Sequence, residues 1–129
     1  MDADLRPDLR SACPVAGALD LVGDKWTLLV VRDLLRGKRR YGDLAASAER
    51  IPTNILADRL RRLEQAGLVE RRQYSERPPR FEYRLTRMGK DLAPAVRTLA
   101  EWGVRYVPGT RVPPDVATTW SATDTVGQG

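Results

Sequence analysis

The sequence predicts a mainly α-helical fold that carries one small β-hairpin. Apolar residues recur at spacings of three and four along several segments, as they do on one face of an amphipathic helix. Two short stretches, 69–74 and 81–85, instead predict extended strands, and a turn over 75–79 joins them. Helix, turn, helix and hairpin follow in that order, which is the order of a winged helix-turn-helix.

Two helices are predicted before the helix-turn-helix. Cys13 and Pro14 open the first, because proline is well suited to the first helical turn, and Gly23 ends it. Asp24 can cap the second helix through its carboxylate. This helix covers 25–35 and is so rich in apolar residues that we expect it at the centre of the core.

The helix-turn-helix itself begins with a short helix over 41–46. A longer helix begins near Pro52 and ends before Gly67, which suits a C-cap. Apolar residues on one side of both helices are expected to face the core: Tyr41, Leu44, Ala45, Ile55, Leu56, Leu60 and Leu63.

The C-terminal part of the chain predicts a last, long helix capped by Thr86. Pro94 should kink this helix, because a proline ring clashes with the preceding turn. Residues 1–11 are expected to form a flexible N-terminal arm, and residues 108–129, rich in Pro, Gly, Thr and Ser, a mobile tail. The folded domain is therefore expected over 12–107.

The composition argues against an enzyme. The 129 residues include one cysteine and no histidine, so neither a zinc-ligand cluster nor an imidazole base can be built in the usual way. We therefore expect no catalytic residue, no metal and no cofactor. No run of about 18 apolar residues is present, and the N-terminus lacks the apolar core of a secretory signal. We accordingly expect no membrane association and a cytoplasmic location.

The positive charge is concentrated in one part of the chain. Residues 36–90 hold 15 Lys and Arg against 7 Asp and Glu, whereas the rest of the chain holds 7 against 10. A local excess of this kind is typical of nucleic-acid binders. The alternative is a solvated surface in an arginine-rich protein.

The outward face of the longer helix carries side chains suited to base recognition. Asn and Arg can bind adenine and guanine edges with two hydrogen bonds, and a small Ala or Thr can meet a thymine methyl. Asp58 has a second interpretation, in which it orients Arg61 or Arg62 from the neighbouring turn. The whole face could also be a solvated polar surface of a core helix. The candidate base-edge residues are Thr53, Asn54, Ala57, Asp58 and Arg61.

Further arginines flank the hairpin and precede the short helix. Such positions favour contacts with phosphates or the minor groove over the reading of major-groove bases. The candidates for these backbone contacts are Arg39, Arg40, Arg77 and Arg80.

Several motifs follow one another along the chain: CPV, ALDLVGDKW, LLRGKRRYGDL, IPTNILADRLRRLEQAGLV, RPPRFEYRLT and LAEWG. Together they resemble the HxlR-type transcriptional regulators, a winged-helix group related to the MarR regulators. The resemblance covers about residues 12–107. It implies a homodimer with the first and last helices packed across a two-fold axis, bound to pseudo-palindromic double-stranded DNA. The leading hypothesis is thus a homodimeric repressor.

The apolar stripes of the first and last helices support a dimer independently. They exceed what one wing domain needs to cover its own core, and unpartnered apolar faces usually meet another chain. The alternative is that both helices fold back on their own domain. The expected interface residues are Val15, Leu19, Val22, Leu92, Val96, Leu99, Trp102 and Tyr106.

Cys13 matches a position that some HxlR-type regulators use to sense electrophiles or oxidants. A thiol at a helix N-terminus lies at the positive end of the dipole, which favours the thiolate, and Arg10 is close in sequence. With no second cysteine in the chain, alkylation or a bridge between the Cys13 residues of two subunits remain as chemistry. The alternative is a small buried side chain at the interface.

Three further hypotheses compete with this reading. A small aromatic effector could bind beside Trp26, Trp102 and Tyr106, although aromatic residues at helical spacing more often belong to a core. A winged-helix protein–protein interaction module without DNA binding would replace the arginines by acids, and those arginines are present. An enzyme with Cys13 as nucleophile would lack a histidine base.

Overall fold

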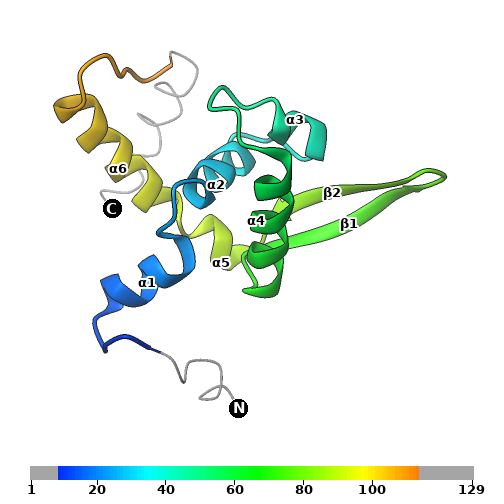
Figure 1. The fold of residues 1–129 in the computed structure, drawn as a ribbon, viewed down its shortest axis with the longest axis horizontal. Helices are drawn as coiled ribbons and strands as arrows, with labels where there is room; N and C mark the ends of the chain where they lie inside the picture. Colours follow the sequence, from blue (N-terminus) through cyan, green and yellow to red (C-terminus); the bar gives the residue numbers. More distant parts are fainter. Residues whose placement is uncertain (1–8, 114–129) are drawn as a thin grey trace.

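The computed structural model describes residues 9–113. This part of the chain forms six helices and one two-stranded antiparallel hairpin, the mainly α winged helix-turn-helix that the sequence predicts (Figure 1). None of these helices is long and apolar enough to cross a membrane. Residues 1–8 of the predicted arm and 114–129 of the predicted tail lie outside the described residues. In chain order the elements are α1 (Pro14–Val22), α2 (Thr27–Leu35), α3 (Tyr41–Ala45), α4 (Thr53–Gln65), β1 (Val69–Glu76), β2 (Pro79–Leu85), α5 (Arg87–Lys90) and α6 (Ala93–Tyr106).

The core forms around α2, as expected. Val30, Val31 and Leu34 of this helix are almost fully buried, and the helix contacts α3, α4, β2 and α6. Burial of a Val or Leu side chain contributes about 1.5–3 kcal/mol, so this cluster fixes how the surrounding helices sit. The other buried apolar residues of the core are Val22, Leu44, Ile51, Leu56, Leu60, Leu63, Leu68, Val69 and Leu85.

The longer helix of the helix-turn-helix, α4, buries one face and ends at a glycine. Leu56, Leu60 and Leu63 follow at spacings of four and three and are all buried. Gly67 adopts φ +88°, its N–H donates to Glu64 O (3.1 Å), and the N–H of Leu68 donates to Leu63 O (2.9 Å). This pair of bonds is a Schellman motif, which confirms the predicted C-cap.

The hairpin is longer than the sequence predicts. Its pairing continues to Ser75–Arg80 and Glu76–Pro79 beyond an irregularity between Gln73 and Ser75. The predicted turn over 75–79 is therefore wrong. The bulge adds one residue to β1 and shifts the register, pairing then resumes toward the tip, and only Arg77 and Pro78 remain in the turn. A short extended segment before α3 joins the sheet edge, where Arg39 O accepts from the N–H of Tyr83 (2.7 Å).

Thr86 ties the base of the hairpin to the end of α4. Its hydroxyl donates to Gly67 O (2.6 Å), and its N–H donates to Leu68 O (2.9 Å). The same hydroxyl accepts from the N–H of Gly89 (3.3 Å), as expected for the cap of the helix that follows. One residue thus connects α4, the hairpin and α5.

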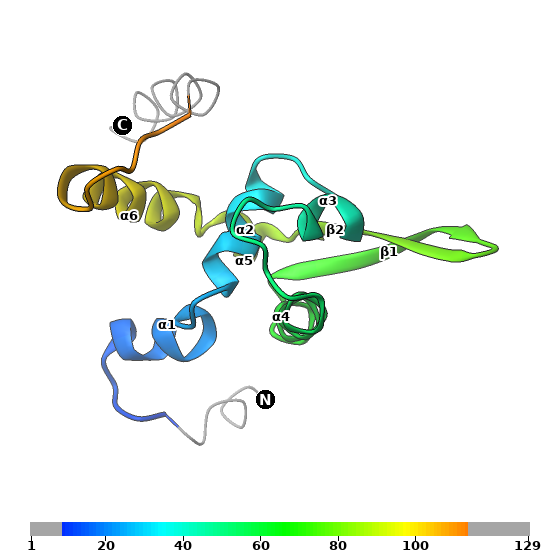
Figure 2. The ribbon, with the colours of Figure 1, turned by 45° about the horizontal axis from the view of Figure 1, so that its top comes forward.

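The predicted single kinked helix after Thr86 is wrong. The chain forms the short α5 and then, after Asp91 and Leu92, the separate helix α6. Pro94 lies in the first turn of α6, where its missing N–H has no intrahelical partner to lose and its ring meets no preceding turn. Helices α1 and α6 both lie at the end of the molecule opposite to the tip of the hairpin (Figures 1 and 2).

Candidate nucleic-acid interface

The outward face of α4 is open to solvent. Thr53, Asn54, Ala57 and Arg61 are all exposed, whereas the side chain of Asp58 is 25% exposed. The first turn of α4 is held by α3, because the hydroxyl of Tyr41 donates to Thr53 O (2.8 Å). The predicted base-edge residues therefore share one accessible helix face.

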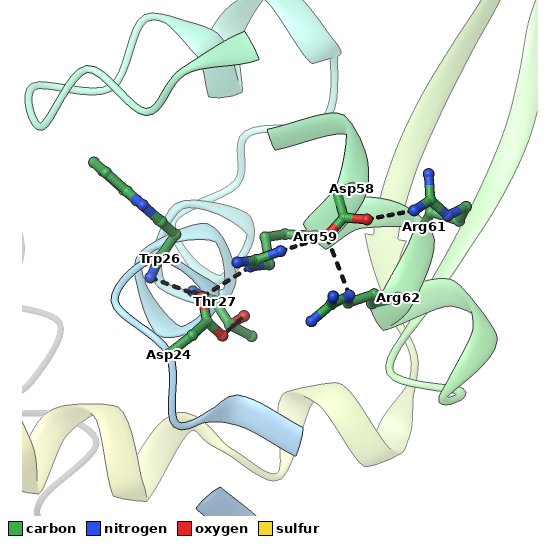
Figure 3. A network of polar contacts seen from close by, with 7 residues as sticks. All are labelled: Asp24, Trp26, Thr27, Asp58, Arg59, Arg61 and Arg62. Carbon is green, nitrogen blue, oxygen red and sulfur yellow. Dashed lines mark hydrogen bonds and ion pairs between the residues drawn. The ribbon is translucent and has the colours of Figure 1, made fainter. Parts of the chain in front are cut away.

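Asp58 lies at the centre of a group of arginines on this face. Its carboxylate accepts hydrogen bonds from Arg59 and Arg61, and one of its oxygens lies 3.1 Å from Nε of Arg62 (Figure 3). The side chains of Arg61 and Arg62 are 60% and 66% exposed, so their outer ends remain in solvent. This geometry favours the second interpretation of Asp58, in which it orients its arginine neighbours.

Arg59 extends the group to the start of α2. Its Nε lies 2.8 Å from a carboxylate oxygen of Asp24, and its own side chain is only 15% exposed (Figure 3). Sequence reasoning missed this pair, because the two residues are 35 positions apart and only the folded chain brings them together. Helix α4 is thereby linked to the junction between α1 and α2.

Asp24 caps the start of α2, although the helix begins at Thr27, two residues later than the sequence predicts, and Trp26 is its N-cap residue. Its carboxylate accepts from the N–H groups of Trp26 (3.0 Å) and Thr27 (3.2 Å), and from the hydroxyl of Thr27. Burial alone would raise the pKa of Asp24, but the hydrogen bonds from Thr27, Arg59 and Trp26 together lower it well below its usual range. The carboxylate is therefore charged at neutral pH and serves two helices.

The predicted backbone-contacting arginines fall into two groups. Arg77 and Arg80 are exposed at the tip of the hairpin. Arg40 stacks over the ring of Tyr74 (4.2 Å to the centroid) and lies 3.8 Å from Glu82, which holds it along the hairpin edge. Arg39 is half-buried and donates to Leu34 O (3.3 Å) and Lys38 O (3.1 Å), so part of its hydrogen-bonding capacity stays inside the domain.

The sequence reasoning also overlooked Arg71 on the hairpin. Its guanidinium lies 4.3 Å from the centre of the Phe81 ring. The two residues are diagonal neighbours on one face of the hairpin, since Arg71 pairs with Tyr83 and Phe81 with Gln73 in the ladder. This contact could have been predicted from the sequence, because the pairing of the two predicted strands brings Arg71 and Phe81 to the same face of the hairpin.

Cys13 is exposed at the N-terminus of α1. Its backbone N–H donates to the hydroxyl of Ser11 (3.2 Å). Arg10 forms an ion pair with Asp20 (2.7 Å) and donates to Ala16 O (3.2 Å), so its charge is engaged along α1. The thiol is thus accessible in the single chain.

The expected interface residues divide between the core and the surface. Val22 is buried in the core of its own domain, and Leu92 and Val96 pack against that core. The remaining five are exposed, by between 51% and 65%: Val15, Leu19, Leu99, Trp102 and Tyr106. Leu21, Val104 and Val107, which the sequence reasoning did not single out, add to this exposed apolar surface.

The aromatic residues proposed for an effector also separate. Trp102 and Tyr106 lie together on α6, with ring centroids 5.3 Å apart. Trp26 packs against the core, with Nζ of Lys25 5.0 Å from its ring centre.

Several proteins similar to this chain are named as transcriptional regulators. The HxlR-like helix-turn-helix family matches residues 21–111. The HTH-type regulator Rv3095 of Mycobacterium tuberculosis is 47% identical over 100 residues, which cover 78% of this chain and 63% of that protein. YdeP of Bacillus subtilis, an HTH-type transcriptional regulator, is 34% identical over 80% of both chains.

Solved structures agree with the sequence relatives. The redox regulator HypR in its reduced form superposes with a TM-score of 0.67 at 35% identity, over 72% of this chain and 92% of that chain. The reduced transcriptional regulator YodB of B. subtilis gives 0.62 at 28% identity, over 78% and 100%. The match spans most of the described domain and includes α4 and the hairpin, and the chain belongs to the HxlR-like helix-turn-helix family of transcriptional regulators.

Proposed function

We propose that this chain is a homodimeric repressor that binds a pseudo-palindromic operator through α4 and the hairpin. The exposed face of α4 is the observation that carries the proposal. Asn54, Ala57 and Arg61 stand on a helix whose opposite side is locked into the core, so the reading side chains are presented on a rigid support. The hairpin extends away from α4 (Figure 1), and the exposed arginines at its tip suit phosphates.

A second copy of the chain is the proposed partner of α1 and α6. The exposed apolar residues of both helices lie at the end of the molecule away from the hairpin tip (Figures 1 and 2). A two-fold dimer formed there leaves both copies of α4 free and places them about one DNA turn, roughly 34 Å, apart. Trp102→Ser should therefore lower the dimer fraction in sedimentation experiments.

The direct test is a gel shift on the DNA that flanks the gene for this chain, with a salt titration. Arg61→Ala should weaken binding, because it removes a hydrogen-bond donor to base edges. Arg87→Ala is the matched control, since Arg87 is 89% exposed on α5 and removes the same charge outside the proposed face. A wild-type protein that shifts no DNA at low salt would favour the protein–protein interaction module instead. Transcription assays on the same DNA distinguish a repressor from an activator.

A response to oxidants or electrophiles through Cys13 is the second proposal. The exposure of the thiol at the start of α1 favours it, as does the likeness to HypR, a redox regulator, and to YodB, of which a diamide-treated structure is known. Diamide would take two electrons and two protons from two Cys13 thiols and leave a disulfide between the subunits. A quinone would instead form a carbon–sulfur bond with the thiolate.

The test compares DNA release by wild type and Cys13→Ser after diamide or quinone treatment. If the wild type releases DNA after either reagent, and added thiol restores binding after diamide but not after the quinone, Cys13 is supported as the sensor. Equal release by Cys13→Ser would refute it. Binding that ignores both reagents would direct attention to a non-covalent aromatic ligand near Trp102 and Tyr106.

A further inference from the structure

Asp58 places a carboxylate among the arginines of the proposed DNA-binding face of α4. It follows Asn54 by four residues and precedes Arg61 and Arg62 by three and four, so all four side chains lie along one stripe of α4. Three arginine side chains converge on it (Figure 3). Arg59 also pairs with Asp24, whereas Arg61 and Arg62 pair with Asp58.

Stability alone gives little reason for this arrangement. Ion pairs between exposed side chains three or four residues apart on a helix contribute little, and Arg61 and Arg62 are 60% and 66% exposed. The larger effect lies in the electrostatics of the face. A carboxylate among DNA-facing arginines opposes the approach of any phosphate, wherever the protein lands on DNA.

The guanidinium group can serve a carboxylate and a base at once. It has five N–H donors in a planar fork, and Asp58 engages one terminal nitrogen of Arg61. The remaining donors stay available for the two acceptors on the major-groove edge of guanine. A phosphate, in contrast, competes with Asp58 for the same charge.

We propose that Asp58 is a specificity-determining residue of the α4 face: it holds Arg61 for a base edge and withholds Arg61 and Arg62 from phosphates. The inference rests on the proposed function, since it requires that α4 meets DNA. On a cognate site, Arg61 keeps its hydrogen bond to Asp58 and forms new hydrogen bonds to guanine. On random DNA the arginines must either leave Asp58 or approach the backbone together with its negative charge. Discrimination thus arises from a penalty on wrong sites as well as from contacts to the right one.

The test uses two duplexes of equal length: one enriched from a random library by the wild-type protein, and the random pool itself. Asp58→Asn should raise the affinity for the random pool about five- to ten-fold at 0.1 M salt, because about one more phosphate contact is gained. The affinity for the enriched duplex should stay within about two-fold, so the ratio between the two falls by about five-fold.

Glu64→Gln is the matched control, because it removes the same charge from the last turn of α4. Glu64 lies 3.9 Å from Arg71 on the hairpin and is 40% exposed. This variant should change both affinities in parallel and leave their ratio unchanged. An equal ratio in Asp58→Asn and Glu64→Gln would overturn the inference, because net charge alone would then explain the effect.

Arg61→Lys provides an independent readout that leaves Asp58 in place. A lysine ammonium is a point charge and cannot serve a carboxylate and both guanine acceptors in one plane. The ratio should fall because the affinity for the enriched duplex drops, while the random-pool affinity is kept. An unchanged ratio in this variant would also overturn the inference. A wild-type protein that binds neither duplex would instead refute the proposed function itself.

Discussion

Replacement of Asp24 by asparagine isolates the link between the start of α2 and α4. Asparagine caps a helix about as well as aspartate does, so the bonds from the N–H groups of Trp26 and Thr27 have an acceptor in the variant. What the substitution removes is the negative charge opposite Arg59, 2.8 Å away.

The magnitude follows from the exposure of the pair. A hydrogen bond to a charged group contributes about 1.5–3 kcal/mol when it is shielded from water. Asp24 is 31% exposed and Arg59 15%, so solvent screening reduces the loss in Asp24→Asn to about 1 kcal/mol. For a domain of this size that is a fall of about 4–8 °C in Tm. Asp24→Ala also removes the cap and should cost about 1 kcal/mol more.

The pH dependence gives a second check with a definite sign. Burial by itself would raise the pKa of Asp24, but its hydrogen bonds outweigh burial, so the pKa is lowered in the folded protein. Its contribution is therefore complete above the unfolded-state pKa, about 3.9, and is lost as the pH falls below that value. The stability difference between wild type and Asp24→Asn should shrink from pH 5 to pH 2.5.

Urea unfolding followed by circular dichroism, at one fixed protein concentration, measures these differences. Asp24→Asn and Asp24→Ala that unfold together would show that the cap contributes nothing beyond the charge. An Asp24→Asn variant as stable as wild type at pH 7, or a difference that stays constant to pH 2.5, would refute the coupling of Asp24 to Arg59.

Two further predictions concern the hairpin and its base. Arg80→Ala should weaken binding to all DNA sequences about equally and reduce the slope of log affinity against log salt by about one unit, as salt titrations will show; a slope equal to that of wild type removes Arg80 from the phosphate contacts. Gly89→Ala should destabilise the fold by about 1–3 kcal/mol, because a Cβ there would lie 2.2 Å from Leu68 O and 2.8 Å from a Leu85 methyl. Gly42→Ala, with no atom within 4 Å of its Cβ, is the control in thermal unfolding and should not lose stability comparably.

Local pattern predicted most of the fold. The spacing of Leu56, Leu60 and Leu63 identified the buried face of α4, and Gly67 marked its end, because both signals lie within a few residues of the structure they specify. The misplaced hairpin turn and the separate α6 have a different origin. Pro94 is compatible with a kink or with a helix start, and the choice depends on how the chain packs after Asp91.

The candidate site was predictable only where its members are close in sequence. The outward residues of α4 follow from helical periodicity, and so does the contact of Asp58 with Arg61 and Arg62. The pair of Asp24 and Arg59 does not, since it joins two elements whose relative position is set by the core. The base contacts and the sensor role of Cys13 stay predictions, because they depend on partners outside this chain.

The hydrogen bonds of Thr86 join α4 and the hairpin into one rigid unit, so the angle between the two elements is fixed. Thr86 forms hydrogen bonds to both Gly67 and Leu68, and Leu68 and Val69 are buried. A rotation of the hairpin relative to α4 would therefore disrupt the core. If α4 and the hairpin bind DNA as proposed, the distance between these two contacts is set when the domain folds. In the proposed dimer, any adjustment to operators with differently spaced half-sites therefore comes from the contact between the two subunits.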